Sequence, residues 1–193
     1  ACIDDARKVF TKLGCRIVPI SIPDMRSAEA AATHVIAAEA ASLHGNWLRT
    51  RPADYSMQVR ARLTRGLAVP AARYIDALRL RGELLGRFIA EVFDKVDVLH
   101  VPSLAIATPS LEESDVGGGP KMDRILAQLT RLHRPFNYLG LPSVALPCGR
   151  MAGDLPVAMQ IAGRPFAEET VLHLAHAYQR ETDWHKTGPQ LPN

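Results

Sequence analysis

The sequence predicts an α/β fold in which helices cover a mixed β-sheet. Three stretches support this: a helical stripe leading through a glycine into an alternating segment, a long amphipathic pattern before a short apolar run, and two apolar runs joined by a turn. Helix and strand periods that alternate along the chain are typical of α/β architectures. The 193 residues are enough for one domain or a cramped two, and a folded chain of this length buries roughly two-thirds of its unfolded surface.

The N-terminal stretch reads as half of an α/β unit. Apolar residues in 2–13 recur at helical spacing, and Gly14 is a natural C-terminal cap. Residues 15–20 then alternate like a strand, which Pro23 closes. We therefore expect a helix followed directly by a strand.

The middle of the chain reads as mostly helical. We expect one helix over 25–44, another starting near Asp54, and a long one whose first turn holds Pro70. The expected apolar seam of the long helix is Ile75, Leu78, Gly82, Leu85, Ile89 and Val92. A buried strand is predicted over 96–101, and a glycine-containing loop then leads to a helix over 121–133.

Two further strands are predicted near the C-terminus, at 143–147 and 157–161. The turn at 151–154 between them suggests that they pair. The last helix opens with Glu168 and Glu169, where acidic side chains favour the helix dipole.

The charge balance argues against a nucleic-acid-binding protein. With 23 basic and 20 acidic residues the net charge is only +3. The stretch from Arg49 to Arg87 is more basic, with nine arginines and three acidic residues. It fits a solvated helical surface, with an anion-binding or partner surface as the alternative. The sequence contains neither an apolar run of membrane-spanning length nor a signal-peptide pattern, so we expect no membrane partner and a cytoplasmic location.

The sequence points to no cofactor and no metal. Cys2, Cys15 and Cys148 are odd in number and widely spaced, which fits reduced thiols better than a disulfide framework. Cys2 and Cys15 are expected in the core, and Cys148 ends a strand. His173 and His176 lie three apart on a helix, a spacing that is only a weak metal signal.

Two blocks near the C-terminus carry a specific backbone pattern. Residues 135–149 contain an Asn and two glycines, with Pro142 and Pro147 at the two ends of one strand. Residues 155–166 hold Gln160 inside an apolar strand, where a buried amide needs hydrogen-bond partners. Gln160 is therefore either a core amide bonded to backbone or a residue that lines a pocket.

These blocks resemble the C-terminal region of the amidase signature family. That family shows an Asn, then Gly-x-Pro, a strand ending Pro-x-Gly, and Leu-Pro-x-x-x-Gln-x-x-Gly before a helix that contains Glu. The resemblance extends to Asp97 in the strand before Pro102, to Tyr74–Ala77 with Arg81, and to the Trp184-His185 pair before Pro189. It implies that residues 1–193 are the C-terminal portion of a single amidase-signature domain.

The resemblance implies hydrolysis of carbon–nitrogen amide bonds by a Ser–cis-Ser–Lys triad with oxyanion donors from a glycine-rich loop. Those groups belong to a Gly/Ser-rich signature that lies N-terminal to the region matched here. The serines nearest to such a context, Ser103, Ser110, Ser114 and Ser143, lack it. No catalytic residue is carried over, so we expect a chain that begins mid-protein, is inactive alone and partners the missing N-terminal part.

By the same resemblance, five residues are candidates for the pocket of a small-molecule amide. They are Ser103, Thr108, Asn137, Gly140 and Gln160. The glutamine-specific component of a tRNA-dependent amidotransferase (its A subunit) remains an alternative, although this chain has Thr130-Arg131 where such proteins usually carry an acid. A non-catalytic binding domain is a third reading. Missing neighbours in the sheet would leave strand edges unpaired. We therefore expect the isolated chain to be marginally stable, and to form a homodimer or to aggregate.

Overall fold

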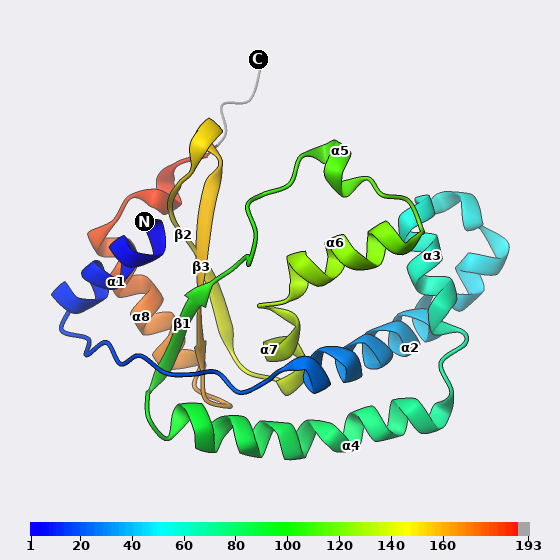
Figure 1. The fold of residues 1–193 in the computed structure, drawn as a ribbon, viewed down its shortest axis with the longest axis horizontal. Coiled ribbons are helices and arrows are strands. Elements are labelled where there is room, and N and C mark those ends of the chain that lie inside the picture. The colour runs from blue at the N-terminus through cyan, green and yellow to red at the C-terminus, as the bar shows by residue number, and fades with distance from the viewer. Residues whose placement is uncertain (189–193) are drawn as a thin grey trace. The chain divides into compact units, whose positions relative to one another are not determined.

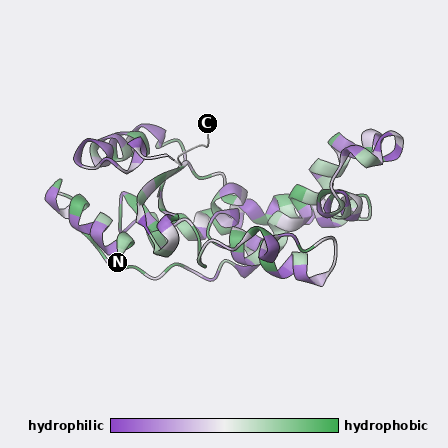
Figure 2. Cartoon of the chain, turned by 90° about the horizontal axis from the view of Figure 1, so that it is seen from above, coloured by the Kyte–Doolittle hydropathy of each residue, from purple (hydrophilic) through white to green (hydrophobic). Residues whose placement is uncertain are grey.

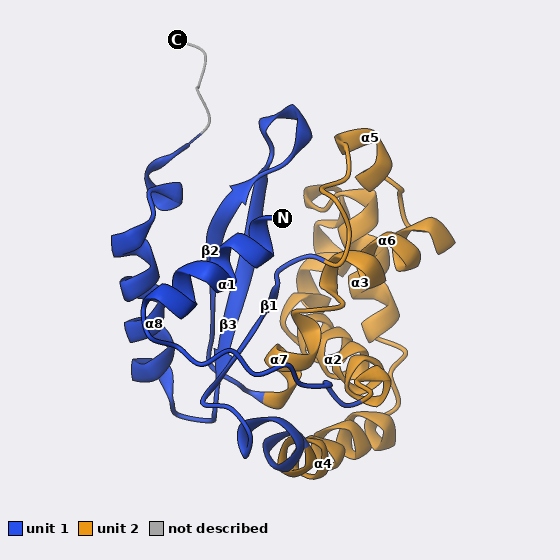
Figure 3. Cartoon of the chain, turned by 60° about the vertical axis from the view of Figure 1, so that its left-hand side comes forward, with its two compact units in different colours: residues 1–23, 88–104, 140–193 blue, residues 24–87, 105–139 orange. Residues whose placement is uncertain are grey.

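The computed structural model describes residues 1–188, which form two compact units (Figure 3). Unit 1 comprises 1–23, 88–104 and the described residues from Gly140 onward. Unit 2 comprises 24–87 and 105–139. Pro189, part of the closing motif of the resemblance, lies outside the described residues.

Unit 1 holds the sheet, and unit 2 is helical (Figure 1). Unit 1 contains α1 (Cys2–Lys12), a π-helical turn (Ile89–Phe93), β1 (Val98–Pro102), β2 (Ser143–Arg150), β3 (Pro156–Gly163), α8 (Glu168–Glu181) and short 3-10 turns at Ala152–Asp154 and Trp184–Lys186. Unit 2 contains α2 (Arg26–Thr50), a 3-10 turn (Pro52–Asp54), α3 (Met57–Gly66), α4 (Ala71–Phe88, whose last residue belongs to unit 1), α5 (Leu111–Ser114), α6 (Pro120–Thr130) and α7 (Arg134–Leu139).

The sheet has the order β1-β3-β2, and both pairs are antiparallel. The predicted pairing of the last two strands is confirmed, as is the combination of helices with a sheet. The described strands include no parallel pair. β2 runs past Pro147 to Arg150 instead of ending at that proline, because a bulge between Pro147 and Gly149 accommodates the missing N–H.

One face of the sheet packs against α1 and α8, which lie together on the same side of the strands (Figures 1 and 3). The buried cluster between them consists of Ala6, Phe10, Leu146, Cys148, Met159, Ile161, Val171, Ala175 and Tyr178. Burying each large side chain stabilises the fold by roughly 1.5–3 kcal/mol. Gly149 is needed beside this cluster, because it has φ +155° and a Cβ there would lie 2.6 Å from the Cys2 Sγ.

In unit 2, the helices meet through small residues and one aromatic anchor. Gly66 allows α3 to lie directly against α2, since a Cβ at this position would stand 2.0 Å from the Ala37 carbonyl oxygen. The Tyr138 hydroxyl donates a hydrogen bond to the Ala77 carbonyl, and the Arg81 guanidinium lies 5.2 Å from the Tyr138 ring centroid. The helices carry hydrophilic and hydrophobic residues side by side along their length (Figure 2).

The strand predicted at Cys15–Ile20 is wrong. The segment is irregular, and within the described residues the backbone groups of 16–22 make no backbone hydrogen bonds. Alternation of apolar residues is a property of the segment itself, whereas a strand also needs a neighbouring backbone to pair with. The preceding helix and the glycine at its end are confirmed, and Gly14 adopts φ +91°.

Three other expectations need correction. The buried stripe of α4 contains Ala77, Leu84 and Phe88, whereas Ile75 and Leu78 of the predicted seam are exposed. α4 carries two adjacent apolar stripes, so helical spacing alone does not select between them. The helix expected at Asp54 begins at Met57, where the Ser56 side chain caps it. The short helix α7 was not predicted, because its Pro and Asn were read as flanking a strand.

No helix within residues 1–188 combines the length and apolar character that a membrane crossing requires.

The packing of α3 on α2 predicts opposite effects for two glycine substitutions in unit 2. Gly66→Ala forces a methyl group onto backbone and is expected to lower the free energy of unfolding by about 1–3 kcal/mol. Gly82→Ala, in the interior of α4 with nothing within 4 Å of the new Cβ, is the matched control and is expected to raise it by about 1 kcal/mol. Urea unfolding followed by circular dichroism measures both, and equal stability of the two variants would contradict the packing described.

Candidate functional site

The second face of the sheet carries polar residues and is the candidate site. Because side chains alternate along a strand, Gln160 points away from the face that holds Met159 and Ile161. Its Oε1 accepts a hydrogen bond from the Ser143 hydroxyl of β2 at 3.2 Å. Register also places Ser103, just after β1, opposite Ala158 and therefore on the same face. We call Ser103, Ser143 and Gln160 the polar face.

Ser103 is the unusual member of the polar face. Its backbone N–H donates to the Ala158 carbonyl at 3.0 Å, so the main chain is fixed as a continuation of β1. Its side chain is only 5% exposed, and its hydroxyl has no hydrogen-bond partner among the described residues. A buried hydroxyl without a partner is costly, and such groups often mark a position where another molecule or segment binds.

The remaining predicted pocket residues do not lie on the strands of the sheet. Thr108 is exposed in the segment between β1 and α5, and Asn137 is exposed on α7; both belong to unit 2. Gly140 belongs to unit 1 and turns the chain from α7 into β2 with φ +71°. Within unit 1, the sheet places Ser103 and Gln160 on one face, together with Ser143, which sequence reasoning had not selected for the pocket.

The hydroxyls of Ser110 and Ser114 serve local structure. Ser110 caps α5 by accepting from the Glu113 N–H, and the Ser114 hydroxyl donates to the Ser110 carbonyl at 2.9 Å. Among residues 1–188 no group of three His, Cys, Asp or Glu side chains is arranged to hold a metal ion.

Unit 1 also contains a cavity of about 840 Å³ beside β1. Its lining includes the irregular segment after Gly14, β1 and the start of α8. His100 reaches into it from β1, with its Nε2 3.1 Å from the Met159 Sδ and its ring edge against Phe10. Burial, assisted by the positive charge of Arg7, lowers the pKa of His100 below its usual value.

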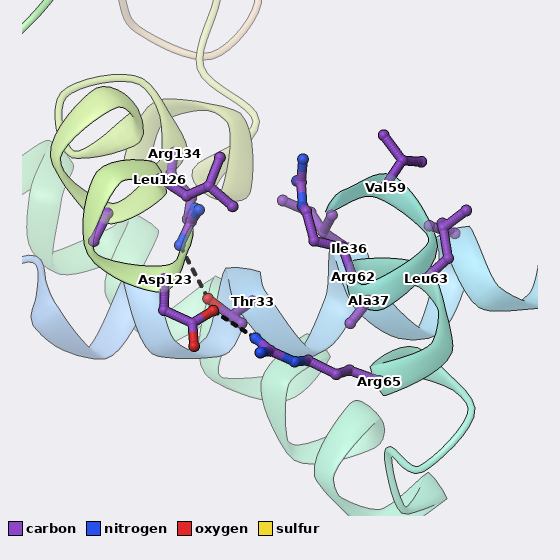
Figure 4. A pocket seen from close by; sticks show the side chains of 12 residues that line it. Thr33, Ile36, Ala37, Val59, Arg62, Leu63, Arg65, Asp123, Leu126 and Arg134 are labelled. Atoms are coloured by element: carbon purple, nitrogen blue, oxygen red, sulfur yellow. Dashed lines mark hydrogen bonds and ion pairs between the residues drawn. The ribbon is translucent and has the colours of Figure 1, made fainter. Parts of the chain in front are cut away.

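Unit 2 contains a cavity of about 470 Å³ between α2, α3, α6 and α7, which sequence reasoning missed (Figure 4). Apolar side chains such as Ile36, Val59 and Leu126 form its walls. Its polar lining residues are Thr33, Arg62, Arg65, Asp123 and Arg134. The density of arginines in the stretch from Arg49 to Arg87 was the signal in the sequence that pointed toward this surface.

The three cysteines are unpaired. Cys2 and Cys15 were expected in the core but are only half-buried, whereas Cys148 is buried. Burial, together with the neighbouring Cys2, raises the pKa of the Cys148 thiol to about 11. A thiol with so high a pKa is a poor nucleophile near neutral pH, which argues against a catalytic Cys148.

The model of the Amidase family matches residues 1–172. The chain belongs to the amidase signature family. Within it, the chain is 33% identical over 192 residues to an amidase of Pseudomonas putida, covering 99% of this chain and 40% of the relative. It is 38% identical over 149 residues to the A subunit of the glutamyl-tRNA(Gln) amidotransferase of Roseiflexus sp. (strain RS-1), covering 75% of this chain and 29% of that protein.

Solved structures agree with the family assignment. A crystal structure described as an amidase superposes with a TM-score of 0.73 at 28% identity and covers 93% of this chain and 44% of its own. A bacterial aryl acylamidase of the amidase signature family shares the fold, with a TM-score of 0.70 at 22% identity, covering 98% of this chain and 42% of its own. The chain thus spans about two-fifths of the length of such amidase signature proteins.

The burial of Cys148 predicts the order in which the thiols are alkylated. At pH 8, iodoacetamide is expected to modify Cys15 and Cys2 before Cys148, because Cys148 is buried and, with a pKa of about 11, is almost entirely protonated. Peptide mass spectrometry over a time course measures the order, and unfolding in urea should remove the difference. Cys148 reacting first in the folded chain would contradict this environment.

Proposed function

We propose that this chain is the C-terminal portion of an amidohydrolase that cleaves carboxylic amides to an acid and ammonia or an amine. The match of the Amidase model over residues 1–172 carries the proposal. The acyl-enzyme mechanism, with a Ser–cis-Ser–Lys triad, comes from the resemblance to the family. In this proposal the triad lies in a part of the protein that precedes the region matched here, and this chain alone is inactive.

The contribution of this chain in the proposal is a wall of the substrate pocket. Support comes from the polar face, where the Ser103 hydroxyl is buried without a partner among the described residues and Gln160 is held by Ser143. A bound amide presents one carbonyl acceptor and N–H donors, which match a serine hydroxyl and a side-chain amide. Thr108, Asn137 and Gly140 remain predicted pocket residues in this proposal.

The partners in the proposal are the substrate amide and the N-terminal part of the same protein. Residues 16–20 and β1 both border the cavity of unit 1. Residues 16–20 make no backbone hydrogen bond among the described residues, and β1 has a described strand partner on one edge only, which supports a role for another segment there. Unpaired thiols support a reducing compartment, so we place the protein in the cytoplasm.

The glutamine-specific component of an amidotransferase is the second candidate, favoured by the Roseiflexus relative. A free glutamine substrate carries an ammonium group that calls for a carboxylate partner. This chain has Thr130 and Arg131 where such a carboxylate is usual, and for this reason we place the general amidase first.

Ammonia release from a panel of amides tests the activity. The complete protein encoded by the gene is expected to hydrolyse aliphatic or aromatic primary amides without a partner protein, and the 193-residue chain is expected to release no ammonia above the buffer blank. A fluorophosphonate probe, which labels activated serines, should mark the complete protein only. Turnover by the 193-residue chain would show that a nucleophile lies within it, and activity on glutamine alone would favour the amidotransferase reading.

The polar face is tested by Ser103→Ala in the complete protein. Removing a buried hydroxyl that has no partner among the described residues should leave the melting temperature unchanged or raise it, whereas loss of one hydrogen bond to substrate should lower kcat/KM about tenfold. Ser114→Ala is the matched control, because that hydroxyl bonds only to its own helix. Full activity of Ser103→Ala would remove Ser103 from the pocket.

A further inference from the structure

The cavity of unit 2 combines an apolar wall with an excess of positive charge (Figure 4). Its volume of about 470 Å³ falls within the roughly 300–1,000 Å³ of small-molecule sites. The lining residues sit at helical spacing on α2 and α6, so whole faces of these helices turn toward it. Ile36 and Val59 are 45% and 41% exposed in the open cavity, which leaves apolar surface for a ligand to cover.

The three arginines of the cavity differ in how they are compensated. Arg65 forms an ion pair with Asp123 and donates to the Gly118 carbonyl at 3.2 Å, so its charge is already matched. Arg134 donates to the neutral Thr33 hydroxyl at 3.1 Å, which orients the guanidinium without neutralising it. Arg62 has no ion-pair partner among the described residues.

Arg62 and Arg134 therefore place on one cavity two positive charges that have no ion-pair partner among the described residues. Burial lowers the pKa of Arg134, the negative charge of Glu29 raises it in part, and the positive charge of Arg62 adds a smaller lowering. A bound anion would relieve this like-charge repulsion, and planar guanidinium groups match the two oxygens of a carboxylate.

We propose that this cavity binds a small organic carboxylate whose aryl or short alkyl body lies against Ile36, Val59 and Leu126, and whose carboxylate is bound by Arg62 and Arg134. The inference goes beyond the proposed hydrolysis and does not require it, since binding is measured without turnover. The sequence left an anion-binding surface open as one interpretation of the arginine-rich stretch from Arg49 to Arg87. The proposal gives that surface a position and a class of ligand.

Calorimetric titration of the complete protein with phenylacetate and hexanoate is the test. Both acids should bind, whereas the neutral 2-phenylethanol and hexanol should bind at least tenfold more weakly, because they lack the charge that Arg62 and Arg134 recognise. Inorganic phosphate should also bind more weakly, since it covers no apolar wall. Equal affinity for acid and alcohol, or for phosphate and phenylacetate, would overturn the proposal.

Matched variants place the binding in this cavity. Arg62→Gln is expected to weaken phenylacetate binding about tenfold, and Arg60→Gln, an exposed arginine of the same helix outside the lining, is expected to leave it unchanged. Asp123→Asn should strengthen phenylacetate binding, because it removes the ion-pair partner of Arg65 and leaves that guanidinium available to the ligand. Ala127→Phe should block binding by filling the cavity from an exposed position without disturbing the core. An equal response of the Arg60 and Arg62 variants would overturn the assignment.

Discussion

The central strand β3 is the constraint on which the sheet unit depends. Both of its edges are paired, with β1 on one side and β2 on the other, so its backbone polar groups are satisfied without help from outside the sheet. Its side-chain alternation then separates two environments. Met159 and Ile161 are completely buried against α1 and α8, while Gln160 points to the other face with Ser143. A shift of one residue in register would exchange these two faces.

Features set by local pattern were predicted well from the sequence. The first and last helices, the pairing of the last two strands and the cap at Gly14 depend on residues close together in the chain. Features set by distant partners were not. Residues 16–20 alternate like a strand but form no backbone hydrogen bond among the described residues. α4 buries the stripe that includes Ala77, whose carbonyl accepts a hydrogen bond from Tyr138, instead of the adjacent stripe.

In the candidate site, too, local sequence pattern predicted some features and partners distant in the chain determined the others. Gln160 could be selected from sequence because an amide within an apolar strand must find a partner, and the Ser143 hydroxyl is one partner that the structure supplies. Ser103 entered only through the family resemblance, and the burial of its hydroxyl, unpartnered among the described residues, is visible only in three dimensions. The cavity of unit 2 needs four helices to form, so no local pattern contains it.

Amide hydrogen exchange on the 193-residue chain tests the central role of β3 most directly. The account predicts that the amides of Val157–Gly163 exchange slowest in unit 1, with those of β1 and β2 faster, and that residues 16–18, 20 and 22 exchange nearly as fast as an unfolded chain. Protection of residues 16–22 equal to that of β3 would contradict the account, because it would mean that this segment is a paired strand and that β3 is not the element on which the sheet depends.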